Sequence, residues 1–280
     1  MFEKHLLARK RILVTGGGSG LGAAMAKRFA ELGADVMICG RRLEVLEGTA
    51  RRLHDETGAR VVVHRCDVRD PAAVDAMMTA IWSDAPLDVL VNNAAATFIA
   101  QTEHLSPRAA DAILAPTLHG AMYCTLAAGR RWIESNHPGV VLSILSTSTI
   151  TGRAFTVPSA MAKSGVLAMT KSLAVEWGPK GVRLVAIAPG SFPTPGASGQ
   201  LRPGGRDDGA ARNPLGRVGD HGELADLASF LISDRAGYIN GEMVVQDGGA
   251  HLRSSGADDL LGWSDARWVE LREAARGGRG

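Results

Sequence analysis

The stretch ILVTGGGSGLGAAMAKRFAELGADVMICGRR, residues 12–42, reads as a strand, a glycine-rich turn, a helix and a second strand. Glycine permits a tight turn and lets backbone N–H groups approach a pyrophosphate at the positive end of the following helix. The glycine spacing is wider here than in the commonest dinucleotide-binding motif. In this context the pattern predicts a dinucleotide site formed by Thr15, Gly16, Ser19, Gly20, Leu21 and Gly22.

Short apolar runs alternate with longer helical patterns along the rest of the chain. The runs are apolar almost throughout, as expected for strands that are covered on both faces. We therefore expect a Rossmann-like α/β fold, a doubly wound parallel seven-stranded sheet with helices on both faces. The expected strands are 11–15, 34–39, 60–65, 87–92, 139–145, 182–188 and 242–247, and the expected helices lie near 20–32, 42–57, 71–83, 106–136, 157–179 and 222–233.

The domain organisation follows from two segments that interrupt this alternation. Residues 191–220 are rich in Pro and Gly and are too long for an ordinary connection, which is typical of a disordered segment or of a lid over a site. We interpret them as a lid within a single domain, residues 1–250. Residues 251–280 carry Trp263 and Trp268 and are expected to form an extension that packs on the same domain.

Composition excludes several classes of function. The net charge of +2 over 280 residues, with no dominant basic stripe, predicts neither a nucleic-acid nor a membrane partner. The three cysteines, Cys39, Cys66 and Cys124, are too few and too scattered for a disulfide framework or a zinc site, so we expect no metal. No signal peptide and no peroxisomal carboxy-terminal signal is recognisable, which predicts a cytoplasmic location.

The residues after the second expected strand predict which dinucleotide binds. A site for NAD places Asp or Glu there, to accept hydrogen bonds from the ribose 2′-hydroxyl. This chain has Arg41 and Arg42 instead. No carboxylate would repel a 2′-phosphate, and a guanidinium can bind one bidentately. The pattern favours NADP(H), and the alternative is that both arginines are solvated residues at a helix start.

Further motifs follow the ends of later strands: CDV at 66–68, NNAA at 92–95, APGSFPT at 188–194 and INGEMVVQDGG at 239–249. Together with the glycine-rich turn, these motifs resemble the short-chain dehydrogenase/reductase family over residues 11–249. The resemblance implies that the cofactor contacts Asp67 and Val68 at adenine, Asn93 at the adenosine ribose, and Pro189, Gly190 and Phe192 beside the nicotinamide.

Members of that family use an Asn, a Ser, a Tyr and a Lys in catalysis. In this chain Ser146 and Lys163 match the serine and the lysine, and His119 stands about where the asparagine is expected. Ser159 stands in place of the tyrosine. Residues 159 and 163 are one helical turn apart, so both can face one cleft. Lys163 would then bind the nicotinamide ribose.

The serine at position 159 has a chemical consequence. Reduction of a ketone by hydride forms an alkoxide that must be protonated, and an aliphatic hydroxyl is a much weaker acid than a tyrosine with a pKa near 10. Hydride addition to a conjugated thioester places the charge on the carbonyl oxygen as an enolate, which needs oriented donors rather than an acid. Ser159 therefore argues against carbonyl reduction and favours reduction of a C=C bond.

The stretches NNAAATFIAQTEHLSP, VPSAMAKSGVLAMTKSLAVEWG and FLISDRAGYINGEMVVQDGG are similar to the 2,4-dienoyl-CoA reductase branch, in which Ser-x-x-x-Lys occurs. The resemblance implies that Phe98 and Ser106 contact the acyl chain or the thioester arm and that Arg69 meets a CoA phosphate. The polarising tyrosine of the branch and its paired asparagine fall on Ser148 and Thr97, which keep a hydroxyl donor.

The sequence therefore predicts an NADPH-dependent oxidoreductase that reduces an unsaturated acyl-CoA, as in fatty-acid β-oxidation. One alternative is a carbonyl or alcohol oxidoreductase, such as a 3-oxoacyl reductase, in which His119 or Ser159 transfers a proton. Another is a cofactor-binding scaffold or sensor whose active site has decayed. His119 is also open to a purely structural interpretation. By analogy with the family, we expect a homotetramer that assembles through residues 106–136 and 157–179.

Overall fold

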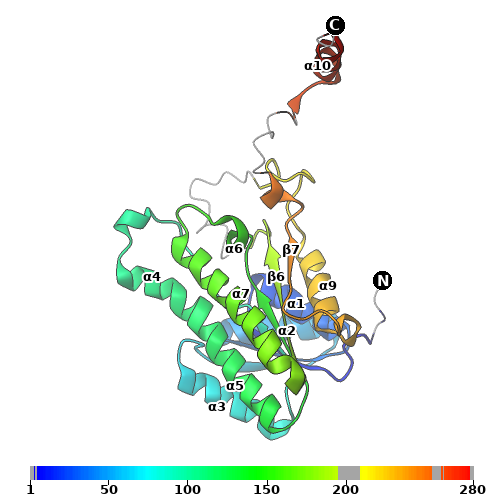
Figure 1. Ribbon diagram of the computed structural model, residues 1–280. Helices are drawn as coiled ribbons and strands as arrows, with labels where there is room; N and C mark the ends of the chain where they lie inside the picture. The colour runs from blue at the N-terminus through cyan, green and yellow to red at the C-terminus, as the bar shows by residue number, and fades with distance from the viewer. Residues whose placement is uncertain (1–2, 4, 195–208, 254–259, 261, 278–280) are drawn as a thin grey trace.

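The core of the fold is a single parallel β-sheet. The computed structural model describes residues 3, 5–194, 209–253, 260 and 262–277. Within these residues, seven strands form one parallel sheet in the order β3-β2-β1-β4-β5-β6-β7 (Figure 1). The predicted doubly wound α/β fold is confirmed. The strands are β1 Arg11–Thr15, β2 Asp35–Gly40, β3 Val61–Arg65, β4 Val89–Asn92, β5 Gly139–Ile144, β6 Val182–Pro189 and β7 Met243–Gln246.

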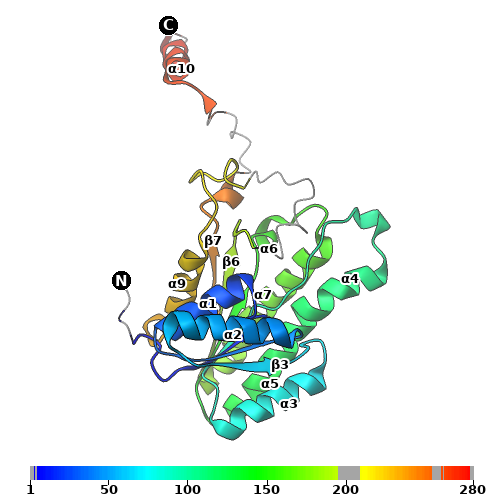
Figure 2. The same ribbon diagram turned by 180° about the vertical axis from the view of Figure 1, so that it is seen from behind.

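Helices cover both faces of the sheet (Figures 1 and 2). Because successive side chains of a strand point to opposite faces, β1 buries Val14 in one apolar core and Leu13 in the other. This explains why the strands are apolar without alternation. The first core lies under α1 Gly20–Glu31, α2 Leu43–Thr57 and α9 His221–Ile232, and the second lies under α3 Pro71–Asp84, α5 Gly120–Glu134 and α7 Val157–Trp177.

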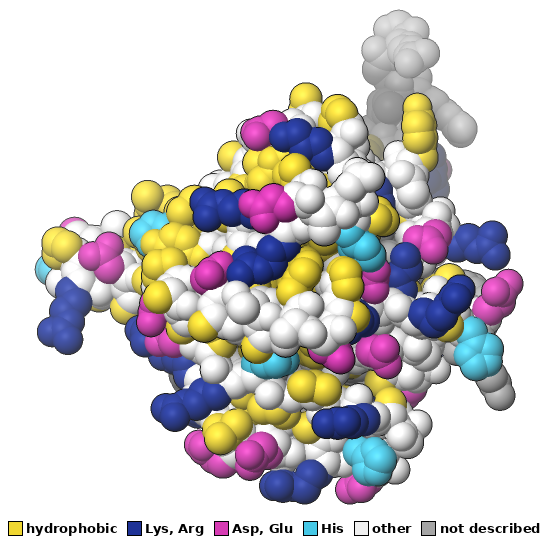
Figure 3. Space-filling view, turned by 90° about the horizontal axis from the view of Figure 1, so that it is seen from below, with side chains coloured by type: hydrophobic (Ala, Val, Ile, Leu, Met, Phe, Trp, Pro, Cys, Tyr) yellow, Lys and Arg dark blue, Asp and Glu magenta, His cyan; other side chains and the backbone are white. Residues whose placement is uncertain are grey.

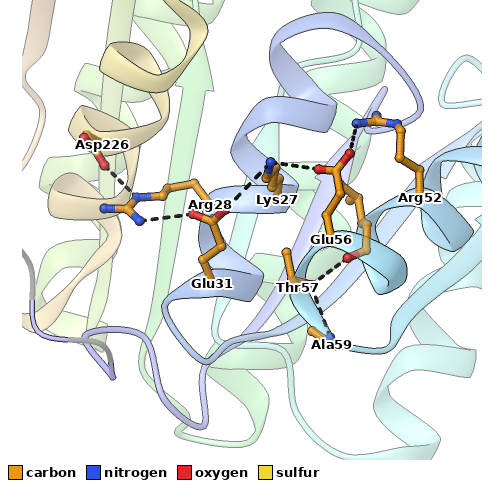
Figure 4. A network of polar contacts seen from close by, with 9 residues as sticks. Lys27, Arg28, Glu31, Arg52, Glu56, Thr57, Ala59 and Asp226 are labelled. Carbon is orange, nitrogen blue, oxygen red and sulfur yellow. Dashed lines mark hydrogen bonds and ion pairs between the residues drawn. The ribbon is translucent and has the colours of Figure 1, made fainter.

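Ion pairs join α1 to the two helices on either side of it (Figure 4). Lys27 lies 2.8 Å from Glu56 at the end of α2, and Arg28 donates to Asp226 of α9 over 2.7 Å. These side chains are partly exposed, so each pair contributes little to stability, about 0–1 kcal/mol. Their common effect is to align α1, whose first turn borders the crevice, with both neighbouring helices.

The helix expected over 106–136 is interrupted. It consists of α4 Pro107–Leu114, a π-helical turn Ala115–His119, and α5. Pro116 lacks a backbone N–H, and single π turns inside helices are frequent at functional sites. Two α-helices were not expected from the sequence: the single turn α6 Ser148–Thr151 and, in the C-terminal extension, the 13-residue α10 Asp265–Gly277.

The lid and the extension are described only in part. The centre of the predicted lid, residues 195–208, lies outside the described residues. In the extension, the rings of Trp263 and Trp268 pack on each other with centroids 5.1 Å apart. The division into residues 1–250 and an extension that packs on the same domain stays a prediction.

The described surface carries mixed charge. Figure 3 shows one face on which acidic and basic side chains are interspersed. Within the described part of the chain, no helix is long and apolar enough to cross a membrane, and no group of three or more His, Cys, Asp or Glu side chains could hold a metal ion. The cytoplasmic location stays a prediction.

Close packing of α5 on α7 gives a test of this fold. A Cβ atom at Gly129 would overlap the ring of Trp177, which is 5% exposed, so the two helices meet only because position 129 has no side chain. We expect Gly129→Ala to lower the free energy of unfolding by about 1–3 kcal/mol, because of overpacking. The matched control is Gly48→Ala in α2, where a Cβ meets nothing within 4 Å. It should raise stability by about 0.5–1 kcal/mol, because alanine is the better helix former. Urea titration measures both, and equal effects would contradict this packing.

Candidate functional site

A cleft of about 580 Å³ lies at the carboxyl ends of the strands, around the point between β1 and β4 where the strand order reverses. Parallel sheets bind ligands at this position, because the connections from the two strands diverge there to opposite faces. One end of the cleft is bordered by the glycine-rich turn and the ends of β2 and β3. The other end is bordered by α6, the start of α7 and the end of β6.

Backbone geometry at the glycine-rich turn requires glycine. Gly16 and Gly20 have φ of +65° and +53°, which other residues rarely adopt. A Cβ at Gly22 would lie 2.5 Å from both Asn93 Nδ2 and the Gly16 carbonyl oxygen. The side chain of Ser19, the residue before α1, forms no capping bond, and the first turn of α1 has no acidic residue. The N–H groups at this positive helix end are therefore suited to bind an anion, which fits a dinucleotide pyrophosphate.

Thr15 and Asn93 join this turn to the end of β4. The Thr15 hydroxyl donates to Val91 O over 3.1 Å and accepts from the backbone N–H groups of Asn93 and Ala94, each over 3.0 Å. Asn93 Nδ2 donates in return to Thr15 O over 2.9 Å. Thr15 is buried behind the cleft, so its effect on a ligand is exerted through the position of the backbone.

Arg41 and Arg42 line the cleft together with Asp67 and Val68. The Asp67 carboxylate accepts from Arg69 Nε over 2.9 Å and from Arg69 Nη2 over 2.6 Å. This bond, with a smaller effect of the charge on Arg41, lowers the pKa of Asp67. Arg69 is therefore engaged at the same end of the cleft as Arg41, and the predicted contact of Arg69 with a CoA phosphate stays a prediction.

The opposite end of the cleft contains the predicted catalytic group. Ser146, Ser148, Ser159, Thr97 and Lys163 all line it. Pro158 favours the start of α7 just before Ser159. The i, i+4 spacing then brings residues 159 and 163 to one face, as predicted from the sequence.

Lys163 is buried at the base of this end. Its ammonium donates to Ile144 O over 2.5 Å, and its side chain is 8% exposed. Burial disfavours the charged form and lowers the pKa of Lys163 to about 8. By contrast, burial raises the pKa of Cys66 to about 11, which leaves that cleft-lining thiol protonated and unreactive at neutral pH.

The structure places some predicted site residues elsewhere. Among the described residues, the lining of the cleft does not include His119, Phe98, Ser106, Arg69 or Thr15. His119 is exposed beside the ring of Tyr123, with centroids 6.2 Å apart. Ser106 accepts from Ala109 N and caps α4. The functional roles predicted for these residues stay predictions. The predicted residues that do line the cleft are Gly16, Ser19, Gly20, Leu21, Gly22, Arg41, Arg42, Asp67, Val68, Asn93, Thr97, Ser146, Ser148, Ser159, Lys163, Pro189, Gly190 and Phe192.

Sequence reasoning missed several lining residues, among them Pro116, Arg153, Thr156 and Thr194. Pro116 is in the π turn, whose register no helical periodicity predicts. Arg153 and Thr156 are in the loop between α6 and α7. The one signal in that loop was Gly152, which has φ of +66°, a backbone conformation that favours glycine.

Comparisons with known proteins agree with this geometry. Residues 16–251 match the profile of a family described as Enoyl-(Acyl carrier protein) reductase. A protein of Bacillus subtilis (strain 168) named "Probable 2,4-dienoyl-CoA reductase" is 43% identical over 88% of this chain and 98% of its own length. The peroxisomal 2,4-dienoyl-CoA reductase of Danio rerio is 35% identical over 97% of this chain and 91% of its own.

A solved structure shows the same fold. The crystal structure of a short chain dehydrogenase from Bacillus anthracis str. 'Ames Ancestor' covers 88% of this chain and 98% of its own, with a TM-score of 0.78 and 38% identity. The residues that match the family, 16–251, include the glycine-rich turn and the Ser-x-x-x-Lys helix. The chain therefore belongs to the short-chain dehydrogenase/reductase family of oxidoreductases.

Proposed function

We propose that the chain reduces a C=C bond of an unsaturated acyl-CoA with NADPH, in the manner of a 2,4-dienoyl-CoA reductase. The observation that carries the proposal is the chemistry of the cleft beside Lys163. Serine and threonine hydroxyls line that end, and no phenol does so among the described residues. The chain has two tyrosines. Tyr123 packs beside His119, and Tyr238 is fully exposed.

These hydroxyls suit one kind of oxyanion and not another. When bound, the nicotinamide cofactor of this family supplies a hydride. The negative charge that a conjugated thioester then acquires is delocalised and comes to rest on the thioester oxygen. Ser148 and Ser159 can donate hydrogen bonds to such an oxygen without giving up a proton. A localised alkoxide needs a proton, which an aliphatic hydroxyl does not release at neutral pH.

The relatives support the same substrate class. Two proteins with 2,4-dienoyl-CoA reductase names align over most of this chain, including the segment that carries Ser159 and Lys163. The choice of NADPH rests on Arg41 and Arg42, which line the cleft where the second strand ends. A guanidinium there can bind a 2′-phosphate bidentately.

Lys163 would hold the nicotinamide ribose. Its ammonium already uses one hydrogen to bond Ile144 O, which fixes the direction of the remaining donors. The buried positive charge would also stabilise negative charge that develops on a substrate in the cleft. Both effects require the protonated lysine, so we infer that they weaken as the pH rises through about 8 in the free protein.

The Lys163→Met variant tests the effect of Lys163 on activity separately from its effect on the free energy of unfolding. The shift of the pKa from 10.5 to about 8 corresponds to a cost of roughly 3 kcal/mol for burying the charge. The pKa is lower in the folded state, so the cost is full below pH 8 and disappears as the pH rises toward 10.5. We expect the variant to lose activity yet to gain about 1–2 kcal/mol of unfolding free energy at pH 7, after the loss of the bond to Ile144 O. The gain should shrink by pH 10, and a gain that is independent of pH would contradict this account.

Substrate class is tested with a panel of 2,4-dienoyl-, 2-enoyl- and 3-oxoacyl-CoAs, followed by NADPH absorbance. We expect the dienoyl thioester to be the best substrate. Ser159→Tyr supplies a phenol, which the described lining lacks, so it should raise 3-oxoacyl reduction by about 100-fold or more and leave dienoyl reduction no faster. Ser159→Ala is the control for loss of the hydroxyl. If the unmodified chain turned over only 3-oxoacyl-CoA, the proposal would fail, and tight NADPH binding with no turnover would favour a scaffold.

Arg41→Ala tests the cofactor preference. Loss of a charge-assisted bond to the 2′-phosphate should weaken NADPH binding by about 10- to 100-fold and leave NADH binding within about twofold. Arg51→Ala is a matched control, because Arg51 is an exposed residue of α2 away from the cleft lining. Fluorescence titration measures both dissociation constants. Equal losses for the two cofactors would remove the role of Arg41 in phosphate binding.

A further inference from the structure

The loop between α6 and α7, residues 152–156, brings a guanidinium to the hydroxyl end of the cleft. Gly152 N donates to Ser148 O over 3.0 Å, and its φ of +66° is a backbone conformation that favours glycine. The carbonyl of the next residue, Arg153, accepts from Thr156 N and Oγ1 over 3.4 and 3.3 Å. Thr156 is 3% exposed. The backbone of Arg153 is thus held against a buried residue at the start of α7.

Arg153 is an exposed residue that lines the cleft with Ser148, Thr156 and Ser159. The other basic residues of the described lining lie at other positions in the cleft. Arg41 and Arg42 lie at the end of β2, and Lys163 is buried with its ammonium bonded to Ile144 O.

Arginine supplies what the hydroxyls do not. It carries a permanent positive charge and several N–H donors, and it cannot be deprotonated in a protein. It can therefore stabilise an anionic oxygen but cannot protonate one. Reduction of a C=C bond requires a group that stabilises the negative oxygen without protonating it, and arginine is such a group. Reduction of a ketone requires protonation of the oxygen, so an arginine could not replace the tyrosine there.

We propose that Arg153 is a catalytic residue that donates hydrogen bonds to the thioester oxygen of the substrate while that oxygen becomes negative. This inference rests on the proposed function. The substrate accepts a hydride at the alkene carbon farther from the thioester, and a new C–H bond forms as the C=C bond breaks. The displaced electron pair reaches the thioester oxygen, next to Arg153. A proton from water then enters at carbon, and NADPH has been oxidised to NADP⁺.

A phosphate of CoA is the other anion that an arginine could bind. The pantetheine arm separates the phosphates of CoA from the thioester by many bonds. Arg153 shares its part of the cleft with Ser148 and Ser159, the residues proposed to bond the thioester oxygen. A guanidinium placed there is at the thioester end of an acyl-CoA, which favours the thioester oxygen.

The experiment compares Arg153→Ala and Arg153→Lys with the unmodified chain on two substrates, a 2,4-dienoyl-CoA and the same acyl group on N-acetylcysteamine, which has no phosphate. We expect Arg153→Ala to lower kcat by about 100-fold on both, as for loss of an oxyanion donor. Arg153→Lys should lose less, because it keeps the charge. Added guanidinium ion, below denaturing concentrations, should restore part of the activity of Arg153→Ala.

The controls separate the possible outcomes. Arg51→Ala should match the unmodified chain and gain nothing from guanidinium. A rise in KM for the CoA thioester alone would assign Arg153 to a phosphate and overturn the proposal. So would a kcat for Arg153→Ala within about twofold of the unmodified value. If the unmodified chain itself reduced neither dienoyl substrate, the proposed function would fail first. NADPH binding by each variant, measured by fluorescence, shows whether the cleft is still folded.

Discussion

The reciprocal hydrogen bonds between Thr15 and the backbone after β4 are the constraint on which the site depends. β1 and β4 pair as far as Val14 and Val91, and beyond that point the strand order reverses and the chain segments that follow the two strands diverge to opposite faces of the sheet. Thr15 Oγ1 accepts from the N–H groups of Asn93 and Ala94, while Asn93 Nδ2 donates to the carbonyls of Thr15 and Gly16. All these groups are part-buried, where an unpaired donor costs about 1–3 kcal/mol. The cleft therefore has a fixed width at its centre.

From that fixed centre the cleft extends toward two ends with different chemistry. At the β2 and β3 end, Arg41 and the open N–H groups of α1 suit the phosphates of a dinucleotide. At the α7 end, the donors are hydroxyls, one buried ammonium and, as we propose, the guanidinium of Arg153. Each end can stabilise negative charge, but in the described lining the hydroxyls and the guanidinium groups do not release a proton easily at neutral pH, and the ammonium of Lys163 is already bonded to Ile144 O. Because these groups can stabilise a negative oxygen better than they can protonate it, we favour reduction of a C=C bond over reduction of a carbonyl group.

Much of this could be predicted from the sequence, because it depends on local patterns. Apolar runs predicted every strand of the sheet to within two residues, since a strand covered on both faces has few polar positions. The side of the sheet on which the cleft opens follows from the position of the glycine-rich turn after β1. Ser159 and Lys163 were placed together correctly, because the i, i+4 spacing holds in any regular helix.

The π turn at Ala115–His119, between α4 and α5, breaks the regular helical spacing that the sequence predicted over 106–136. Each residue turns a helix by roughly 100°, so an inserted residue moves those beyond it to another face.

Arg153 shows why the rest could not be predicted. A comparison with the family considers only the aligned positions. At the two positions where the family and the dienoyl-CoA reductase branch have a tyrosine, 159 and 148, this chain has serine. An enolate oxygen, however, requires donors at a point in space, and any nearby chain segment can provide them. Here the segment is a five-residue loop, whose path depends on the positive φ of Gly152 and on the contact of Thr156 with the Arg153 carbonyl. Neither feature has a periodic sequence pattern. Where a site lacks the family's tyrosine, the residue that we propose stabilises the negative oxygen is therefore found from the folded path of the loop 152–156. It is not found from the aligned positions of the missing tyrosines.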